Sequence, residues 1–177
     1  TTGTDLVSLN DVIADINVES GRAIVNPEKL FTAAGQEKLI CPSTSGGKNY
    51  PAGTYSPLTG LMYYPLQNTC MMMTATDAPR DTAVTYAMRS TIQLAPGEEN
   101  VGTIQAISVS TGQTAWEYQQ RAGMLSLMST GGGLLFGGDA NGRFRAYDDR
   151  SGEVLWEINL GAPVNGYPAT FAVNGKQ

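Results

Sequence analysis

The apolar residues between positions 102 and 160 fall into short runs that are separated by turn-forming residues. Each run is rich in aliphatic or aromatic side chains and is bounded by Gly, Asn or Asp. This pattern is typical of short β-strands joined by tight turns. The strands that it predicts are Thr103–Ser108, Thr114–Gln119, Met124–Met128, Leu134–Gly137, Arg143–Tyr147 and Val154–Ile158.

Two hairpins are predicted outside this region. Thr54–Ser56 and Leu61–Tyr64 flank the turn sequence Pro57-Leu58-Thr59-Gly60, in which proline and glycine favour a reversal of the chain. Further on, Ala169–Val173 is predicted to be a strand that leads into the hairpin turn Asn174-Gly175.

Residues 71–98 show no regular hydrophobic period. We therefore expect a long excursion loop there, with some helix around Arg80–Met88. A loop of this length within a compact fold is uncommon and is usually functional or decorative.

Two segments, 40 positions apart, repeat the eleven-position pattern Ala-x-(Ser/Asp)-x-x-(Thr/Ser)-Gly-(Gln/Glu)-x-x-Trp. They are Ala106–Trp116 and Ala146–Trp156, and they contain both tryptophans of the chain. One copy alone fits an ordinary β-hairpin. Two copies in register predict a repeat array such as a propeller, in which one small sheet cannot bury its faces alone.

The residue types within each copy indicate a tight turn and a docking side chain. Gly112 and Gly152 supply the positive φ that such a turn needs, and Trp116 and Trp156 present flat rings that can stack on a neighbouring blade. We therefore predict an all-β chain with four antiparallel strands per blade. Propellers close with roughly four to eight blades and about three and a half fit here, so residues 1–177 are expected to be part of a larger propeller.

Composition excludes several classes of function. A net charge of −5 opposes a nucleic-acid interface, and there is no apolar run long enough to span a bilayer. The chain has no histidine, which excludes Ser-His-Asp triads, zinc–histidine sites and histidine acid–base chemistry within these residues. It also has no Cys-x-x-Cys-His segment for attachment of a c-type haem.

Two cysteines, Cys41 and Cys70, are 29 positions apart. They form either a disulfide or two free thiols, and the β-rich composition favours the disulfide. A disulfide indicates an oxidising compartment such as a periplasm.

The repeated segments resemble the tryptophan-docking motif of pyrroloquinoline quinone (PQQ)-dependent alcohol dehydrogenases, which are eight-bladed propellers. Ser108 departs from the usual Asp of that motif. Cys41–Tyr50 is similar to the family's segment from a cysteine to Gly-Gly-Lys-Asn-Trp, with Tyr50 in place of Trp. Tyr55–Tyr63 is similar to the hairpin that follows it. The resemblance extends over most of residues 15–177, except for 71–98.

This resemblance implies a periplasmic oxidoreductase that oxidises an alcohol, polyol or sugar. In the family, PQQ is bound noncovalently near the propeller axis, a calcium or lanthanide ion polarises it, an aspartate is the general base, and a c-type cytochrome accepts the electrons. The expected partners are therefore a small alcohol or sugar, a cytochrome c and the rest of the propeller.

The resemblance also implies roles for four residues. Asn49 corresponds to an asparagine that contacts the quinone; its alternative role is to cap its own glycine-rich loop. Met124 stands where methanol-oxidising members often place a tryptophan beside the cofactor, which points to a larger substrate; its alternative role is core packing. Cys41 and Cys70 correspond to a paired cysteine couple.

The metal ligands and the catalytic base of this family come from earlier blades, and no matching motif is present in this sequence. We therefore assign no catalytic residue and no metal ligand. Asp139 and Asp148 lie in predicted turns, where a structural role is expected.

Two other functions fit a repeat of this kind. A non-enzymatic propeller with PQQ-like repeats, acting as a protein-binding scaffold in the cell envelope, would share the docking motif but not the Gly46-Gly47-Lys48-Asn49 loop between cysteines. A WD-type interaction propeller would carry Gly-His pairs, which a chain without histidine lacks. The enzyme is the interpretation that accounts for most of the motifs.

Overall fold

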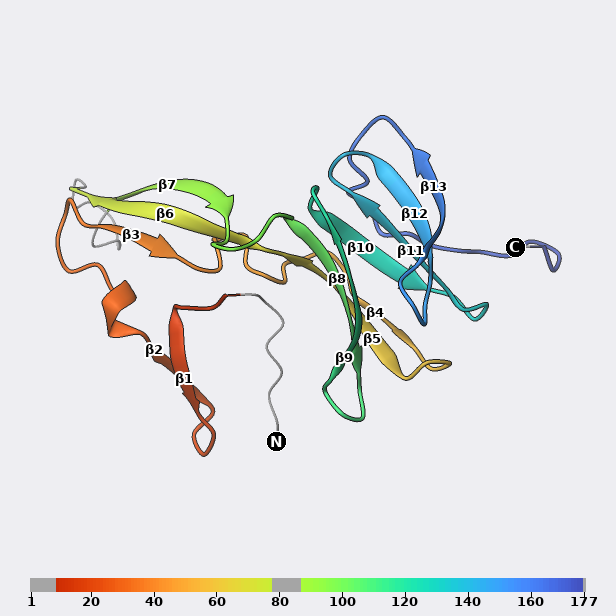
Figure 1. Cartoon of the computed structure of the whole chain (residues 1–177), viewed down its shortest axis with the longest axis horizontal. Helices are drawn as coiled ribbons and strands as arrows, with labels where there is room; N and C mark the ends of the chain where they lie inside the picture. Colours follow the sequence, from red (N-terminus) through yellow and green to blue (C-terminus); the bar gives the residue numbers. More distant parts are fainter. Residues whose placement is uncertain (1–8, 78–86, 177) are drawn as a thin grey trace. The chain divides into compact units, whose positions relative to one another are not determined.

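The computed structural model describes residues 9–77 and 87–176, and its regular structure is almost entirely β (Figure 1). These residues belong to two compact units. Of the described residues, the first unit contains 48–67 and 99–176, and the second contains 9–47, 68–77 and 87–98.

Two four-stranded antiparallel sheets make up the first unit, which confirms the predicted strand number and direction. The first sheet has the order β4-β5-β8-β9 and the second the order β10-β11-β12-β13. All six strands predicted after residue 102 are present, each longer by one or two residues. The first sheet consists of β4 (Thr54–Ser56), β5 (Leu61–Gln67), β8 (Gly102–Ser108) and β9 (Thr114–Gln120). The second consists of β10 (Met124–Ser129), β11 (Leu134–Asp139), β12 (Arg143–Asp148) and β13 (Val154–Asn159).

The core of the first unit lies between its two sheets. β5, β8 and β10 are mostly buried, whereas β9 and β13 lie at the sheet edges and are largely exposed. Alternation along β8 and β12 directs every second side chain inward. The buried cluster contains Leu61, Tyr63, Ile104, Ala106, Met124, Leu127, Leu135 and Tyr147.

Trp116 at the end of the first repeat docks on the turn of the second repeat. Its indole N–H donates to the backbone oxygen of Asp149 at 3.1 Å, and its ring lies 5.6 Å from that of Tyr63, centroid to centroid. A Cβ atom at Gly152 would lie 2.6 Å from the indole ring. The Ser-Gly turn therefore needs its glycine for the approach of the tryptophan as well as for its φ of +74°.

Trp156 has the same place in its own sheet, since it pairs with Ala146 as Trp116 pairs with Ala106. Its side chain is nevertheless 49% exposed. The reason is that a docking tryptophan is covered by the turn of another sheet, and not by its own. Among the described residues, Trp156 therefore remains on an open face of β13.

The second unit contains a hairpin and a three-stranded antiparallel sheet in the order β3-β6-β7. Its disulfide joins Cys41 to Cys70, both fully buried beside Ala95. The predicted disulfide is therefore confirmed. The elements of this unit are β1 (Ile13–Asn17), β2 (Arg22–Val25), the 3₁₀ turn η1 (Pro27–Lys29), β3 (Glu37–Ile40), β6 (Thr69–Thr76) and β7 (Ala87–Leu94).

The segment 71–98 differs from the expected irregular loop. Its described residues form most of β6 and all of β7, which pair along eight positions. Figure 1 shows the two strands side by side. β6 escaped prediction because its unbroken run, Met71-Met72-Met73, does not alternate. In β7 the apolar residues Met88, Ile92 and Leu94 do lie at alternate positions, but Ser90 interrupts the series, so this strand escaped prediction too. Of the helix expected around Arg80–Met88, residues 80–86 lie outside the described residues, and Ala87 begins β7.

The segment Ala169–Val173 is not a strand, which corrects the prediction made from its apolar residues. Only the turn forms: Val173 and Lys176 exchange two backbone hydrogen bonds of 2.8 and 3.0 Å around Asn174-Gly175. Both turn residues have positive φ, 50° and 76°, as a tight hairpin turn requires. The local dipeptide is therefore sufficient for a turn, but a strand needs a sheet beside it.

Helical structure in residues 9–77 and 87–176 is confined to the single turn η1. No helix in this range has the length or apolar character needed to cross a membrane.

Candidate cofactor-binding region

Lys48-Asn49-Tyr50 is the exposed part of a loop that leads into β4. The Lys48 ammonium donates to the backbone oxygens of Asn49, at 2.6 Å, and Pro51. Partial burial of this ammonium lowers the pKa of Lys48. The Tyr50 N–H donates to Oδ1 of Asn49 at 2.7 Å. Both side chains therefore help to shape the loop that carries them, which agrees with the capping alternative for Asn49.

The end of this loop is attached to β10. The Ala52 N–H donates to Oγ of Ser126 at 3.1 Å, and the Leu127 N–H donates to the backbone oxygen of Ala52 at 2.9 Å. Ser126 is 2% exposed. One residue of the loop is thus held from both sides, by a buried hydroxyl and by the backbone of the strand.

A β-bulge lies at the same place in β10. Met124 is opposite Asp139 and Leu127 is opposite Gly137, so β10 has one more residue than β11 over this stretch. A bulge releases backbone groups from the ladder and re-aims side chains. The bulge therefore lets β10 pair with β11 and also hydrogen-bond the loop at Ala52.

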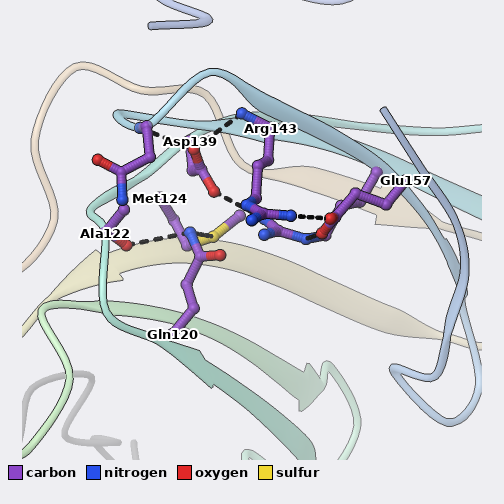
Figure 2. A network of polar contacts seen from close by, with 8 residues as sticks. Gln120, Ala122, Met124, Asp139, Arg143 and Glu157 are labelled. Carbon is purple, nitrogen blue, oxygen red and sulfur yellow. Dashed lines mark hydrogen bonds and ion pairs between the residues drawn. The ribbon is translucent and has the colours of Figure 1, made fainter. Parts of the chain in front are cut away.

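Met124 is at the start of β10 and is 1% exposed. Nε2 of Gln120 lies 2.9 Å from its sulfur and also donates to the backbone oxygen of Ala122 at 3.0 Å (Figure 2). Met124 belongs to the buried cluster between the sheets, which agrees with its packing alternative. Asn49 and Met124 are thus on two attached segments, the loop and β10, but one side chain is exposed and the other is buried.

An ionic network at the ends of β11 to β13 was not predicted from the sequence. NH1 of Arg145 lies 2.8 Å from Oδ2 of Asp139, and Nε of Arg145 lies 2.6 Å from Oε2 of Glu157. The side chains of Arg145 and Asp139 are only 6% and 1% exposed. Arg143 pairs with Glu157 at the surface. The signal that could have revealed Arg145 is its spacing of two from the buried Tyr147, which places both on the same face of β12.

Asp139 also closes the turn that follows it. Its Oδ1 accepts the N–H groups of Asn141, at 2.7 Å, and Arg143, at 3.0 Å. This agrees with the structural role expected for Asp139 from its place in a turn sequence. Burial alone would raise the pKa of this carboxyl group, but the backbone N–H of Arg143, the Arg145 guanidinium and the N–H of Asn141 outweigh that effect and hold the pKa of Asp139 below its ordinary value.

This lowered pKa predicts acid sensitivity. The folded state stabilises the charged form of Asp139. The carboxylate therefore contributes to the free energy of unfolding above its pKa in the unfolded chain, about 3.9, and this contribution is lost as the pH falls from there through its lower pKa in the folded protein. We expect Asp139→Asn to be less stable than the wild type at pH 7 and to lose less further stability between about pH 4 and pH 2. Urea unfolding measured across this range tests the difference. Parallel pH profiles for the two proteins would contradict it.

Comparisons with known proteins agree with this arrangement. Residues 98–177 match the family described as glucose/ethanol/alcohol dehydrogenase, beta-propeller domain. The chain is 32% identical over 161 residues to the lanthanide-dependent methanol dehydrogenase of Methylacidiphilum fumariolicum, covering 89% of this chain and 26% of that protein. It is 27% identical over 175 residues to methanol dehydrogenase [cytochrome c] subunit 1 of Methylorubrum extorquens, covering 94% of this chain and 28% of that protein.

A solved structure, a europium-containing methanol dehydrogenase, superposes with a TM-score of 0.82 at 30% identity and covers 95% of this chain and 30% of that one. The chain is related to the quinoprotein alcohol dehydrogenases. It spans about a quarter of the length of the curated relatives that it matches.

The donors of the loop fit the cofactor of quinoprotein alcohol dehydrogenases. Lys48 and Asn49 bring an ammonium and a carboxamide to one exposed loop, and such groups hydrogen-bond the carbonyl oxygens of a quinone. The metal that accompanies the quinone has no matching site here. Within residues 9–77 and 87–176, no group of three or more His, Cys, Asp or Glu side chains is arranged to hold an ion.

Proposed function

We propose that this chain is a late portion of the propeller of a PQQ-dependent dehydrogenase that oxidises an alcohol, polyol or sugar-type substrate to an aldehyde or ketone. The observation that carries the proposal is the loop Lys48–Ala52, which presents hydrogen-bond donors and is attached to β10 at Ala52. Its support comes from relatives that include methanol and quinone-linked alcohol dehydrogenases. The rest of the propeller would supply the catalytic base and the ligands of a calcium or lanthanide ion.

In this proposal, PQQ held beside the loop would supply the two-electron acceptor for alcohol oxidation. The chain's own contribution is to bind and orient the quinone. The carboxamide of Asn49 hydrogen-bonds a quinone oxygen that gains negative charge during reduction, which favours the reduced state more than the oxidised one. Lys48 holds the backbone of the loop through the oxygens of Asn49 and Pro51, so the Asn49 side chain starts from a fixed position.

Met124 packs in the buried cluster of this chain, and in this proposal it would lie behind the wall of this region. The thioether is flexible and smaller than an indole, so replacing the tryptophan found in many methanol-oxidising members leaves space for a substrate larger than methanol. Gln120 holds the sulfur from one side. The smaller side chain at position 124 supports an alcohol or sugar substrate larger than methanol.

The electron acceptor and the compartment follow from the same proposal. One relative is named as a cytochrome c-linked methanol dehydrogenase subunit, and we propose a c-type cytochrome as the acceptor here. The buried disulfide between Cys41 and Cys70 is stable in an oxidising environment. It supports a periplasmic location.

The first experiment is mass spectrometry of small molecules released by denaturing the natively purified full-length protein that contains this chain. PQQ at close to one equivalent is the expected result. If PQQ is absent, and remains absent after incubation with PQQ and Ca²⁺ or a lanthanide, the proposal is wrong and the envelope scaffold takes its place.

Asn49→Ala tests the role of the loop. We expect the full-length variant to bind PQQ about tenfold more weakly, since one hydrogen bond to a charge-bearing oxygen is lost. Its melting temperature should change little. The matched control is Asn159→Ala, because Asn159 is also exposed and its Oδ1 also accepts a nearby backbone N–H, that of Gly161 at 2.8 Å. Equal PQQ affinity in both variants would show that Asn49 caps its loop and does not contact the quinone.

A further inference from the structure

Ser126 occupies a place in β10 that neither the sequence motifs nor the comparisons identify. It is a polar residue with 2% exposure in a strand whose neighbouring positions Leu125 and Leu127 are buried and apolar. A buried hydroxyl without a partner is costly. The Oγ of Ser126 is hydrogen-bonded to the loop before β4, where it accepts the N–H of Ala52 at 3.1 Å.

This contact is at the boundary between the loop and β4. Ala52 follows Pro51, whose backbone oxygen accepts a hydrogen bond from Lys48, and it is three positions after Asn49. On the other side of the contact, Met124 is two residues before Ser126 on β10. The hydroxyl therefore joins the segment that presents Asn49 to the strand that carries Met124.

The bulge in β10 indicates that this junction is a specific feature. The extra residue lies between Met124 and Leu127, which is where Ser126 is found. In a regular strand the side chains alternate without interruption, whereas the extra residue of a bulge shifts this alternation relative to the partner strand. The bulge instead leaves the Ser126 hydroxyl directed at Ala52, while the Leu127 N–H bonds the oxygen of the same residue.

We propose that Ser126 is a positioning residue for the quinone: it fixes the loop Lys48–Ala52 against β10 and thereby sets the place of Asn49 relative to Met124. This rests on the proposed function, because it assumes that the loop and β10 both border bound PQQ. Ser126 does not touch the quinone. Its hydrogen bond restricts the loop before the quinone binds. Less conformational entropy is then lost on binding.

β10 also offers a matched control in Ser129. Its hydroxyl connects the same strand to β4, at 2.8 Å from both Oγ1 of Thr54 and the backbone oxygen of Tyr55. Ser129 is beyond the bulge and contacts residues that follow Ala52 in the chain. Ser129→Ala therefore removes an inter-sheet hydroxyl of the same kind without releasing the loop.

The test uses cofactor-free full-length protein and titrates it with PQQ in the presence of Ca²⁺, following binding by quenching of tryptophan fluorescence. We expect Ser126→Ala to raise the dissociation constant about three- to tenfold, the loss of one net hydrogen bond. Ser129→Ala should bind like the wild type. Ser126→Thr, which keeps the hydroxyl, should bind within about twofold of the wild type.

Hydrogen exchange on the same proteins separates positioning from general stability. The Ala52 amide should exchange faster in Ser126→Ala and unchanged in Ser129→Ala, even if both variants melt at the same lower temperature. An unchanged dissociation constant in Ser126→Ala, or an equal loss in Ser129→Ala or Ser126→Thr, would overturn the inference. Failure of the wild type itself to bind PQQ would instead overturn the proposed function beneath it.

Discussion

Arg145→Ala is expected to lower the free energy of unfolding by about 3–5 kcal/mol, the range found when one partner of a buried ion pair is removed. The cause is the carboxylate that remains. Asp139 is 1% exposed and receives the Arg145 guanidinium at 2.8 Å, so the variant would bury a charge without its counterion. Its backbone donors, the N–H groups of Asn141 and Arg143, remain and limit the loss.

Arg143→Ala is the control for this prediction. Arg143 is on the same strand and shares the partner Glu157, but its side chain is 47% exposed. A solvent-exposed pair contributes about 0–1 kcal/mol, so this variant should unfold at nearly the wild-type urea concentration. Equal losses in the two variants would show that Asp139 does not depend on Arg145.

Trp116→Ala is expected to destabilise the chain by about 3–5 kcal/mol, as removal of a large packed aromatic side chain does. The indole covers the turn at Gly152, stacks beside Tyr63 and donates to the backbone of Asp149. The contacts with Gly152 and Asp149 join the first sheet of the unit to the turn between β12 and β13 of the second, and the contact with Tyr63 lies within the first sheet. Urea unfolding followed by circular dichroism measures the loss.

Trp156→Ala in the same 177-residue chain serves as the comparison. The two tryptophans share one sequence motif, but Trp156 is 49% exposed, so a loss below about 1 kcal/mol is expected. Gly152→Ala tests the same docking contact by changing the turn instead of the tryptophan. Its added Cβ would lie 2.6 Å from the Trp116 ring, and we expect it to be less destabilising in the Trp116→Ala background than in the wild type. Independent, additive losses would mean that the ring does not rest on this turn.

The candidate site was only partly predictable. The Gly-Gly-Lys-Asn sequence was enough to identify the loop, because it is a local pattern. The contacts that fix this loop connect Ala52 to Ser126, 74 positions away, and no period or motif relates two residues so far apart. Arg145 escaped prediction for a related reason: its burial depends on Asp139 and Glu157, which other strands supply.

Hydrophobic pattern and turn chemistry were sufficient wherever the cause is local. Strand alternation and bounding glycines placed the six strands from Gly102 to Asn159, and Asn174-Gly175 formed its turn without a strand beside it. These features depend on φ preferences and on side-chain order within a few residues, which the sequence determines by itself.

Only the tertiary structure decided which of the two similar motifs has its tryptophan covered, which hydroxyl holds the loop and whether residues 71–98 contain strands. Trp116 and Trp156 differ because one has another sheet's turn against it. β6 forms because it pairs with β7 on one side and β3 on the other, although its own sequence does not alternate. In each case the deciding free energy comes from contacts between segments distant in the chain, and such contacts exist only once the sheets have assembled.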